Sequence, residues 1–340
     1  MDEKAPSVTA RSLTSHRSAK ASLAELYSHF KSRDHVLITI DPDPDAIGSA
    51  LALKRLLWHK VQSTTIGIIR PIRRLNNLTM VRLLRIPLVL LKDVSVDAYT
   101  RYLLVDSQPH HNDFFRRLSY TVVIDHHPLN TPVAAPFTAI YPQYGATATI
   151  LTQYLREAKI KPSQGLATTL LYAIKTDTRN FERHTTEADI DAFRYLFRYA
   201  NHHIMRKIEI SDLALSDLRY FQKAVARKHV ARDRIFAHLD EVPSADILVE
   251  IAEFFLKIHD ISWSIVSGIY EGHLIISVRS DGYRKDAGRT VRKAFESIGC
   301  AGGHQAMARV EIPMDKVTTI LGKASSRNIE AYIRRQLSPM

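Results

Sequence analysis

Short runs of β-branched and apolar residues recur along the first half of the chain. Strands are predicted at residues 36–40, 102–105 and 121–124, which are rich in Val, Ile, Leu and Thr. Residues 50–58 instead repeat their leucines at helical spacing. A succession of strand, acidic turn and helix predicts an α/β fold whose mostly parallel sheet has helices on both faces.

The later pattern predicts further helices and a second, smaller α/β domain. One helix is expected from Gly145 to about Ala158, and another opens with Thr185 as its N-cap. The second domain starts near Arg234, with strands at residues 235–239, 263–269 and 274–278 and helices near residues 245–257 and 286–298. The expected organisation is a disordered basic tail at residues 1–20, a catalytic domain at 21–210, a helical connector at 211–233 and a substrate-binding domain at 234–340.

Metal-binding side chains follow four of the apolar segments. These are Asp41-Pro42-Asp43-Pro44-Asp45, then Asp106, then Asp125-His126-His127, and finally Asp177 after residues 170–176. Ligands bind at the carboxyl ends of strands in open α/β sheets. Carboxylates gather in one place only where cations neutralise them. Many Asp with one or two His favour manganese, magnesium or cobalt over a structural zinc ion.

Composition adds a basic charge to this picture. The chain of 340 residues has a net charge of +12 and a pI near 9.7. Arginines and lysines cluster at residues 70–85, 219–234 and 279–293, which suits a phosphorylated or polyanionic substrate. Solvated helix faces or a generally basic proteome would explain the same charge.

Cysteine content and hydropathy bear on location. A single cysteine, Cys300, excludes an intramolecular disulfide, and a reducing cytoplasm is therefore the expectation. No stretch is apolar enough for a membrane span, and the N-terminus lacks the apolar core of a signal peptide.

Together these motifs resemble the DHH phosphoesterase superfamily, in particular its small members with a DHH-associated C-terminal domain. The segment from Asp43 to Ser49 is similar to the first motif, Asp106 to the second, Asp125-His126-His127 to the third and Asp177 to the fourth. Gly302-Gly303-His304 resembles the glycine-rich signature of the C-terminal domain. The motifs occur in order over residues 34–315. The resemblance implies an active site in the cleft between the two domains.

The first motif departs from the small members at Thr39, where they usually have a metal-binding His. Asp41, Asp43 and Asp45 instead resemble the three alternating Asp of RecJ-type exonucleases. Alternate residues of an extended segment face the same way, and the intervening prolines favour extended backbone. Our hypothesis is that Asp41 replaces the missing His as a ligand of the first metal. The alternative is that Asp41 only caps the turn and the first metal binds weakly.

The resemblance also implies a role for each site residue. Asp106 bridges two divalent metal ions, of which manganese is favoured; Asp43 with Asp41 completes the first site, and Asp45, His126 and Asp177 complete the second. His127 is free of metal and acts on the phosphate or leaving group as a donor or general acid; alternatively, it orients a neighbouring ligand. The residues expected to bind substrate are Arg279, Ser280, Arg289, Gly302, Gly303 and His304.

The function that the resemblance implies is hydrolysis of phosphate esters in very short oligoribonucleotides, linear dinucleotides or 3'-phosphoadenosine 5'-phosphate. Alternatives are a cyclic dinucleotide phosphodiesterase, a polyphosphatase or pyrophosphatase, and a single-strand exonuclease. A different class is a non-catalytic, nucleotide-binding regulatory protein that has lost its first metal. The sequence determines neither the direction of cleavage nor the oligomeric state, for which a homodimer is one option.

Overall fold

The structure is a computed structural model that describes residues 18–283 and 286–338. The chain divides into two compact units, the first ending at Ser211 and the second beginning at Asp212. Residues 1–17 of the predicted disordered tail lie outside the described residues, and Ala19 already begins a helix. In the described part of the chain, no helix has the length and apolar character that a membrane span requires.

The first unit is built on a six-stranded parallel sheet in the order β3-β2-β1-β4-β5-β6. Its strands are β1 (His35–Ile40), β2 (Ser63–Ile68), β3 (Val89–Leu90), β4 (Arg101–Val105), β5 (Val122–Asp125) and β6 (Phe137–Ile140). The predicted parallel α/β sheet is thus confirmed. The strand order reverses between β1 and β4, and the crevice outside the carboxyl ends of such a pair is where ligands bind in this architecture.

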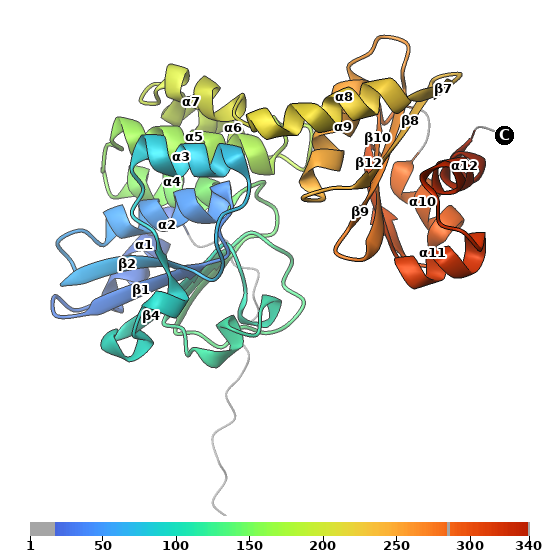
Figure 1. Cartoon of the computed structure of the whole chain (residues 1–340). Helices are drawn as coiled ribbons and strands as arrows, with labels where there is room; N and C mark the ends of the chain where they lie inside the picture. The colour runs from blue at the N-terminus through green and yellow to red at the C-terminus, as the bar shows by residue number, and fades with distance from the viewer. Residues whose placement is uncertain (1–17, 284–285, 339–340) are drawn as a thin grey trace, which may run out of the picture. The chain divides into compact units, whose positions relative to one another are not determined.

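Both faces of this sheet are covered. Ile38, Leu103 and Ile124 pack into the main core with the helices α2 (Pro44–Leu56), α4 (Thr147–Glu157) and α5 (Gln164–Asp177), which lie on one side of the sheet in Figure 1. Leu104 and Val123 point the other way, as alternation along a strand requires. They pack against Phe115 and Tyr120, so the 3-10 helix η4 (Phe115–Arg117) and its flanking loops cover that face.

One local prediction needs correction, and one apolar segment that was given no element is a helix. Residues 170–176 form the last turns of α5. This segment is buried almost throughout, so its hydrophobicity carries no period that separates helix from strand. The helix expected to be capped by Thr185 is α6 (Glu187–Phe197), and its N-cap is Thr186. Thr186 is the N-cap because Asp189, three residues later, completes a reciprocal capping box with it.

The remaining helices of the first unit surround this core. They are α1 (Ala19–Ser28), α3 (Leu75–Leu84), α7 (His202–Glu209) and the 3-10 helices η1 (Leu91–Asp93), η2 (Val96–Ala98) and η3 (Pro109–His111).

The second unit has a mixed sheet in the order β11-β12-β10-β9-β8-β7. Its elements are η5 (Leu215–Asp217), α8 (Leu218–Arg227), β7 (His229–Ala231), β8 (Arg234–Glu241), α9 (Asp246–Leu256), β9 (Trp263–Tyr270), β10 (His273–Ser280), α10 (Ala287–Phe295), β11 (Cys300–Gly303), β12 (Met307–Pro313), α11 (Met314–Leu321) and α12 (Ser326–Leu337). Strands β8 and β9 are parallel, and the other neighbours are antiparallel. The segment expected to be a helical connector contains α8 and also β7, which pairs with β8.

His238 gives the second unit a pH-dependent stability. Its side chain is buried in β8, where Nδ1 lies 3.0 Å from the hydroxyl of Ser267. Burial lowers the pKa of His238 to about 4, with help from the charges of Lys223 and Arg227 and against that of Asp240. An unfolded chain protonates this histidine near its ordinary pKa of about 6.5, so the folded state loses stability as the pH falls from about 6.5 to 4.

We therefore expect the free energy of unfolding to fall by up to about 1.4 kcal/mol for each pH unit of acidification in that window. A His238→Asn variant should show a shallower dependence, whereas a His259→Asn variant, altered at an exposed histidine, should match the wild type. Denaturant titrations at pH 7, 6 and 5 provide the measurement. If the free energy of unfolding changed equally with pH in the wild type and in His238→Asn, the pH dependence would not come from His238.

Candidate metal centre

Asp45 enters the site from the first turn of α2. Asp43 caps this helix by accepting a hydrogen bond from the amide of Ala46 at 2.8 Å, and Pro44 occupies its first position. Asp45 is 1% exposed, and its carboxylate accepts hydrogen bonds from the backbone amides of Thr147 at 2.7 Å and Ala148 at 2.8 Å. These amides begin α4, so the positive end of one helix holds a carboxylate from another.

Asp106 enters directly after β4 with a left-handed backbone, at φ +59°. This conformation is uncommon for a residue with a side chain and is concentrated at functional sites. The Asp106 amide donates to the carbonyl of Ile124 at 2.8 Å, which fixes the turn. Its carboxylate is buried and accepts a hydrogen bond from the hydroxyl of Thr147 at 2.8 Å.

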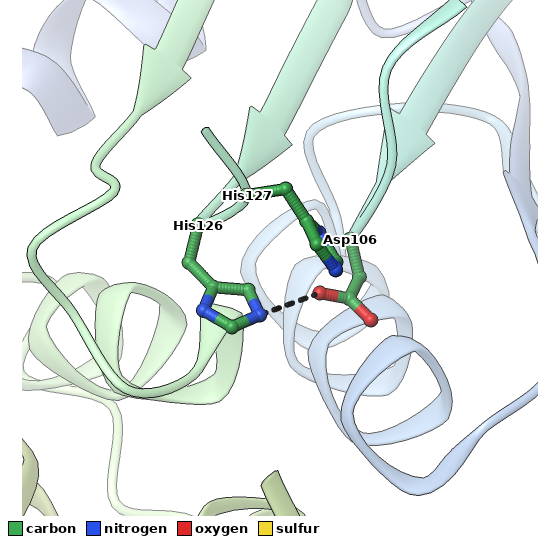
Figure 2. Close-up of side chains that lie close together, drawn as sticks. All are labelled: Asp106, His126 and His127. Carbon is green, nitrogen blue, oxygen red and sulfur yellow. Dashed lines mark ion pairs between the residues drawn. The ribbon is translucent and has the colours of Figure 1, made fainter. Parts of the chain in front are cut away.

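His126 joins these carboxylates from the end of β5. Its Nδ1 lies 3.1 Å from the carbonyl oxygen of Tyr144. Because a carbonyl only accepts hydrogen bonds, Nδ1 carries the proton and Nε2 is the atom that faces the site. The distances from Nε2 are 3.0 Å to Asp177, 3.6 Å to Asp106 and 3.9 Å to Asp45. Figure 2 shows the pair of His126 and Asp106.

The electrostatics of this cluster favour a cation. Burial and the nearby charge of Asp177 raise the pKa of Asp45 to about 7. Burial and the surrounding carboxylates also raise the pKa of Asp106. Burial opposes the charged form of His126, yet Asp177 and Asp45 raise its pKa to about 9. Crowded carboxylates stay ionised at neutral pH only with a positive partner among them.

The ligand atoms fit a divalent ion. Asp45, His126 and Asp177 form one group whose ligand atoms lie within 4.8 Å of one another, and Asp106, His126 and His127 form a second. Carboxylate oxygens with an imidazole suit manganese, magnesium or cobalt. The structure thus brings together Asp45, Asp106, His126, His127 and Asp177, although Asp177 comes from the end of a helix.

Asp125 has a task that the sequence did not reveal. It is fully buried, and its Oδ1 lies 2.8 Å from Nδ1 of His127. It also accepts hydrogen bonds from Gln108 Nε2 at 2.8 Å and from the His126 amide at 2.9 Å. The bond to Asp125 raises the pKa of His127, whereas burial lowers it. Asp125 therefore orients His127; the sequence signal that could have indicated this role is an Asp at a strand end, two residues before a His.

Residues of the first motif are engaged by partners within the protein. Thr39 is buried and donates to the carbonyl of Leu103 at 3.1 Å, so it is tied into the sheet. Asp41 is paired with Arg70, whose Nε lies 2.5 Å from its Oδ1. Neither Asp41 nor Asp43 belongs to the two ligand groups found among the described residues. Their roles at a first metal stay predictions.

The predicted substrate-binding residues gather at one end of the second sheet. Gly303 ends β11 at φ +154°, and a Cβ on Gly288 of α10 would lie 2.3 Å from its carbonyl oxygen. Gly288 also donates its amide to the carbonyl of His304 at 2.9 Å, so β11 and its following turn lie against the first turn of α10.

The other members of this set have protein partners. The Ser280 hydroxyl donates to the carbonyl of Gln305 at 3.1 Å, and the Arg289 amide donates to Asp286 at 2.7 Å. Arg279 is paired with Glu253 through its Nε at 3.2 Å, and its side chain is 12% exposed. A substrate that uses the Arg279 guanidinium therefore competes with Glu253.

Binding of a cation among these carboxylates should change the thermal stability of the protein. We expect excess Mn²⁺ to stabilise the wild type by RT ln(1 + [L]/Kd), about 2.7 kcal/mol at a hundredfold excess over Kd. An Asp106→Asn variant should gain little from Mn²⁺, because an amide replaces a charged ligand. In EDTA its melting temperature should not fall below that of the wild type, because burial and the neighbouring carboxylates already raise the pKa of Asp106. The control is Asp113→Asn, at a carboxylate with 87% of its side chain exposed. Thermal melts of all three proteins with Mn²⁺ and with EDTA provide the test; equal Mn²⁺ shifts in the wild type and Asp106→Asn would count against a cation site here.

Comparison with known proteins identifies a domain that contains these residues. The DHH family N-terminal domain matches residues 35–174, which include Asp45, Asp106 and His126. An uncharacterised protein of Methanocaldococcus jannaschii is 34% identical over 304 residues, which is 89% of this chain and 63% of that protein. The chain therefore spans less than two thirds of this relative's length.

Two solved structures share the fold. An exopolyphosphatase-related protein from Bacteroides fragilis has a TM-score of 0.66 at 16% identity, covering 95% of this chain and 99% of that one. RecJ from Thermus thermophilus, in complex with Mn²⁺, has a TM-score of 0.51 at 13% identity, covering 95% of this chain and 56% of that one. Residues 35–174 thus match the DHH family N-terminal domain, and the likeness to these two structures shows a shared fold.

Proposed function

We propose that this protein is a metal-dependent phosphoesterase that hydrolyses phosphate esters of short nucleotides. The observation that carries the proposal is the position of His126 Nε2, which faces the carboxylates of Asp45, Asp106 and Asp177 within 3.9 Å. A second imidazole, His127, lies beside Asp106 in Figure 2. The match of residues 35–174 to the DHH family N-terminal domain supports the same activity, and RecJ from Thermus thermophilus in complex with Mn²⁺ shares this fold.

The proposed cofactors are two divalent metal ions, with manganese favoured because the fold is shared with a Mn²⁺-bound RecJ. Bound divalent ions would offset phosphate charge and make water acidic enough to supply a nucleophile near neutral pH. In this proposal Asp106 would contribute to holding both ions, Asp45, His126 and Asp177 would hold the second, and Asp43 with Asp41 would hold the first.

His127 is the proposed catalytic donor. Its Nδ1 hydrogen bond to the buried carboxylate of Asp125 holds the ring and favours the imidazolium. The remaining ring nitrogen then carries a proton that it can donate to a phosphate oxygen or to the leaving group. This assignment keeps His127 off the metal. The ligand atoms of His127, Asp106 and His126 lie within 4.8 Å of one another, so direct coordination of a metal ion by His127 is the competing role.

Substrate contacts are assigned to the second unit. Gly302, Gly303 and His304 adjoin the start of α10, and the absence of side chains at the two glycines lets a phosphate approach the backbone closely. Arg279, Ser280 and Arg289 complete the proposed surface.

Polyphosphate is the second candidate substrate. The exopolyphosphatase-related protein of Bacteroides fragilis shares this fold over 99% of its length, and polyphosphate would require no base contacts. The two substrates differ in whether a base is recognised.

A substrate panel tests the function. We expect the full chain with Mn²⁺ to hydrolyse a labelled linear dinucleotide or 3'-phosphoadenosine 5'-phosphate faster than a cyclic dinucleotide or polyphosphate. Asp106→Ala should abolish turnover, and Asp113→Ala, altered at an exposed carboxylate, should not affect it. Binding without turnover of any substrate would replace the enzyme with a regulatory nucleotide-binding protein. Preferential cleavage of polyphosphate would shift the assignment to the second candidate.

Metal titration tests the first site. If Asp41 is a ligand, Asp41→Ala should lose about one Mn²⁺ ion per chain or weaken its affinity at least about tenfold, whereas Arg70→Ala should retain both ions, because it removes only the ion-pair partner of Asp41. Isothermal titration with Mn²⁺ gives both stoichiometry and affinity. Unchanged stoichiometry and affinity in Asp41→Ala would leave Asp41 as a partner of Arg70 alone.

A further inference from the structure

One turn of the chain contacts three of the proposed ligands. Residues 144–148, called here the 144–148 turn, lead from β6 into α4. The Tyr144 carbonyl accepts Nδ1–H of His126, and the Thr147 and Ala148 amides donate to Asp45. The Thr147 hydroxyl donates to Asp106. A shift of this turn would therefore move groups that hold Asp45, Asp106 and His126 at the same time.

Asp189 fastens this turn from α6. It is fully buried, and both its oxygens accept the Gly145 amide, at 3.0 and 3.1 Å. Oδ1 also accepts the hydroxyl of Thr149 at 2.6 Å, and Oδ2 accepts the amide and hydroxyl of Thr186 at 2.8 and 2.7 Å. The two oxygens thus join the start of α6 to a segment that lies 40 or more residues earlier in the sequence. Such charge-assisted bonds are stronger than neutral ones.

The packing around Gly145 leaves the turn little freedom. A Cβ at this position would lie 2.7 Å from Cγ2 of Thr178, 2.9 Å from the His184 carbonyl oxygen and 3.1 Å from Oδ2 of Asp189. Contacts this short are incompatible with a side chain unless backbone moves. Thr178 directly follows Asp177, so the turn is pressed against the end of α5 that carries another proposed ligand.

We propose that Asp189 is a positioning residue for the metal centre, acting through the 144–148 turn on Asp45, Asp106 and His126. The inference rests on the proposed metal site but not on which phosphate ester is cleaved. The carboxylate matters because the Gly145 amide, the Thr149 hydroxyl and both groups of Thr186 donate to it. An amide side chain at this position would present an NH₂ group to one of them, and a buried donor would then lack its acceptor.

Asp189→Asn tests this role with almost no change of shape. Full-length protein is titrated with Mn²⁺, following affinity by calorimetry and ion environment by electron paramagnetic resonance. We expect Mn²⁺ affinity to fall about 10- to 100-fold, as for other residues that orient metal ligands, with an altered spectrum at saturation. Wild-type affinity and spectrum in a folded Asp189→Asn protein would overturn the proposal.

Asp34→Asn is the matched control for a purely structural effect. Asp34 is also a buried carboxylate, 4% exposed, that accepts the Lys31 amide at 2.8 Å and faces Thr100 and Arg101 at 3.3 Å. It immediately precedes β1, at the sheet edge opposite the ligands. Asp34→Asn should lower the melting temperature while leaving Mn²⁺ affinity unchanged. Equal losses of affinity in both variants would reduce Asp189 to a general stabiliser and overturn the proposal.

Thr149→Val keeps the proposal testable if Asp189→Asn does not fold. This nearly isosteric change removes only the 2.6 Å hydrogen bond between Thr149 and Asp189. We expect a smaller loss of Mn²⁺ affinity than in Asp189→Asn, about threefold to tenfold, and no loss would overturn the proposal. Wild-type protein that binds Mn²⁺ but cleaves no phosphate ester would contradict the proposed function alone, whereas the affinities of the variants would still decide the role of Asp189.

Discussion

The candidate site depends on keeping several carboxylates close together where water does not solvate them. Asp45 and Asp106 are buried, and Asp177 lies beside them at the His126 imidazole. Mutual repulsion and lost hydration both disfavour the ionised forms of Asp45 and Asp106, which is why the pKa values of these two carboxyls rise. The fold must therefore hold these groups against a force that would separate or neutralise them. Most features of the site follow from that requirement.

The fold meets this requirement with donors fixed in the backbone. Asp45 accepts hydrogen bonds from two backbone amides at the start of α4, and Asp106 accepts one from the hydroxyl of Thr147 in the same turn. Amides at a helix start carry a partial positive charge and need no side-chain ordering to reach their acceptor. The parallel strands bring Asp106 and His126 to one edge, where the strand order reverses between β1 and β4, and the end of α5 adds Asp177. The sheet therefore helps to determine which ligands meet, and the start of α4 supplies the hydrogen bonds that hold Asp45 and Asp106 there.

Local patterns in the sequence predicted those features of the site that depend on neighbouring residues of the chain. The β-branched runs before Asp106 and Asp125 indicated two strand ends, and parallel pairing then placed both residues at one sheet edge. The helix that ends at Asp177 was not distinguishable from a strand, because its residues are apolar on nearly every side. Contacts of Asp189 with Gly145 and Thr149 span 44 and 40 positions and leave no periodic trace. The ion pair of Asp41 with Arg70 is likewise invisible in the alternating Asp pattern.

The two adjacent histidines show how partners outside a motif divide its tasks. Nδ1 of His126 meets a neutral carbonyl, that of Tyr144, whereas Nδ1 of His127 meets the ionised carboxylate of Asp125. The carbonyl fixes the tautomer and leaves Nε2 of His126 among the carboxylates, where a bound cation would replace the proton that they favour at this atom. A carboxylate stabilises the imidazolium, which suits His127 to give a proton. Asp125 can do this because hydrogen bonds from His127, Gln108 and the His126 amide keep it ionised, and burial alone would have raised its pKa. Neighbouring residues of one type thus differ in chemistry because the fold supplies each with a different acceptor.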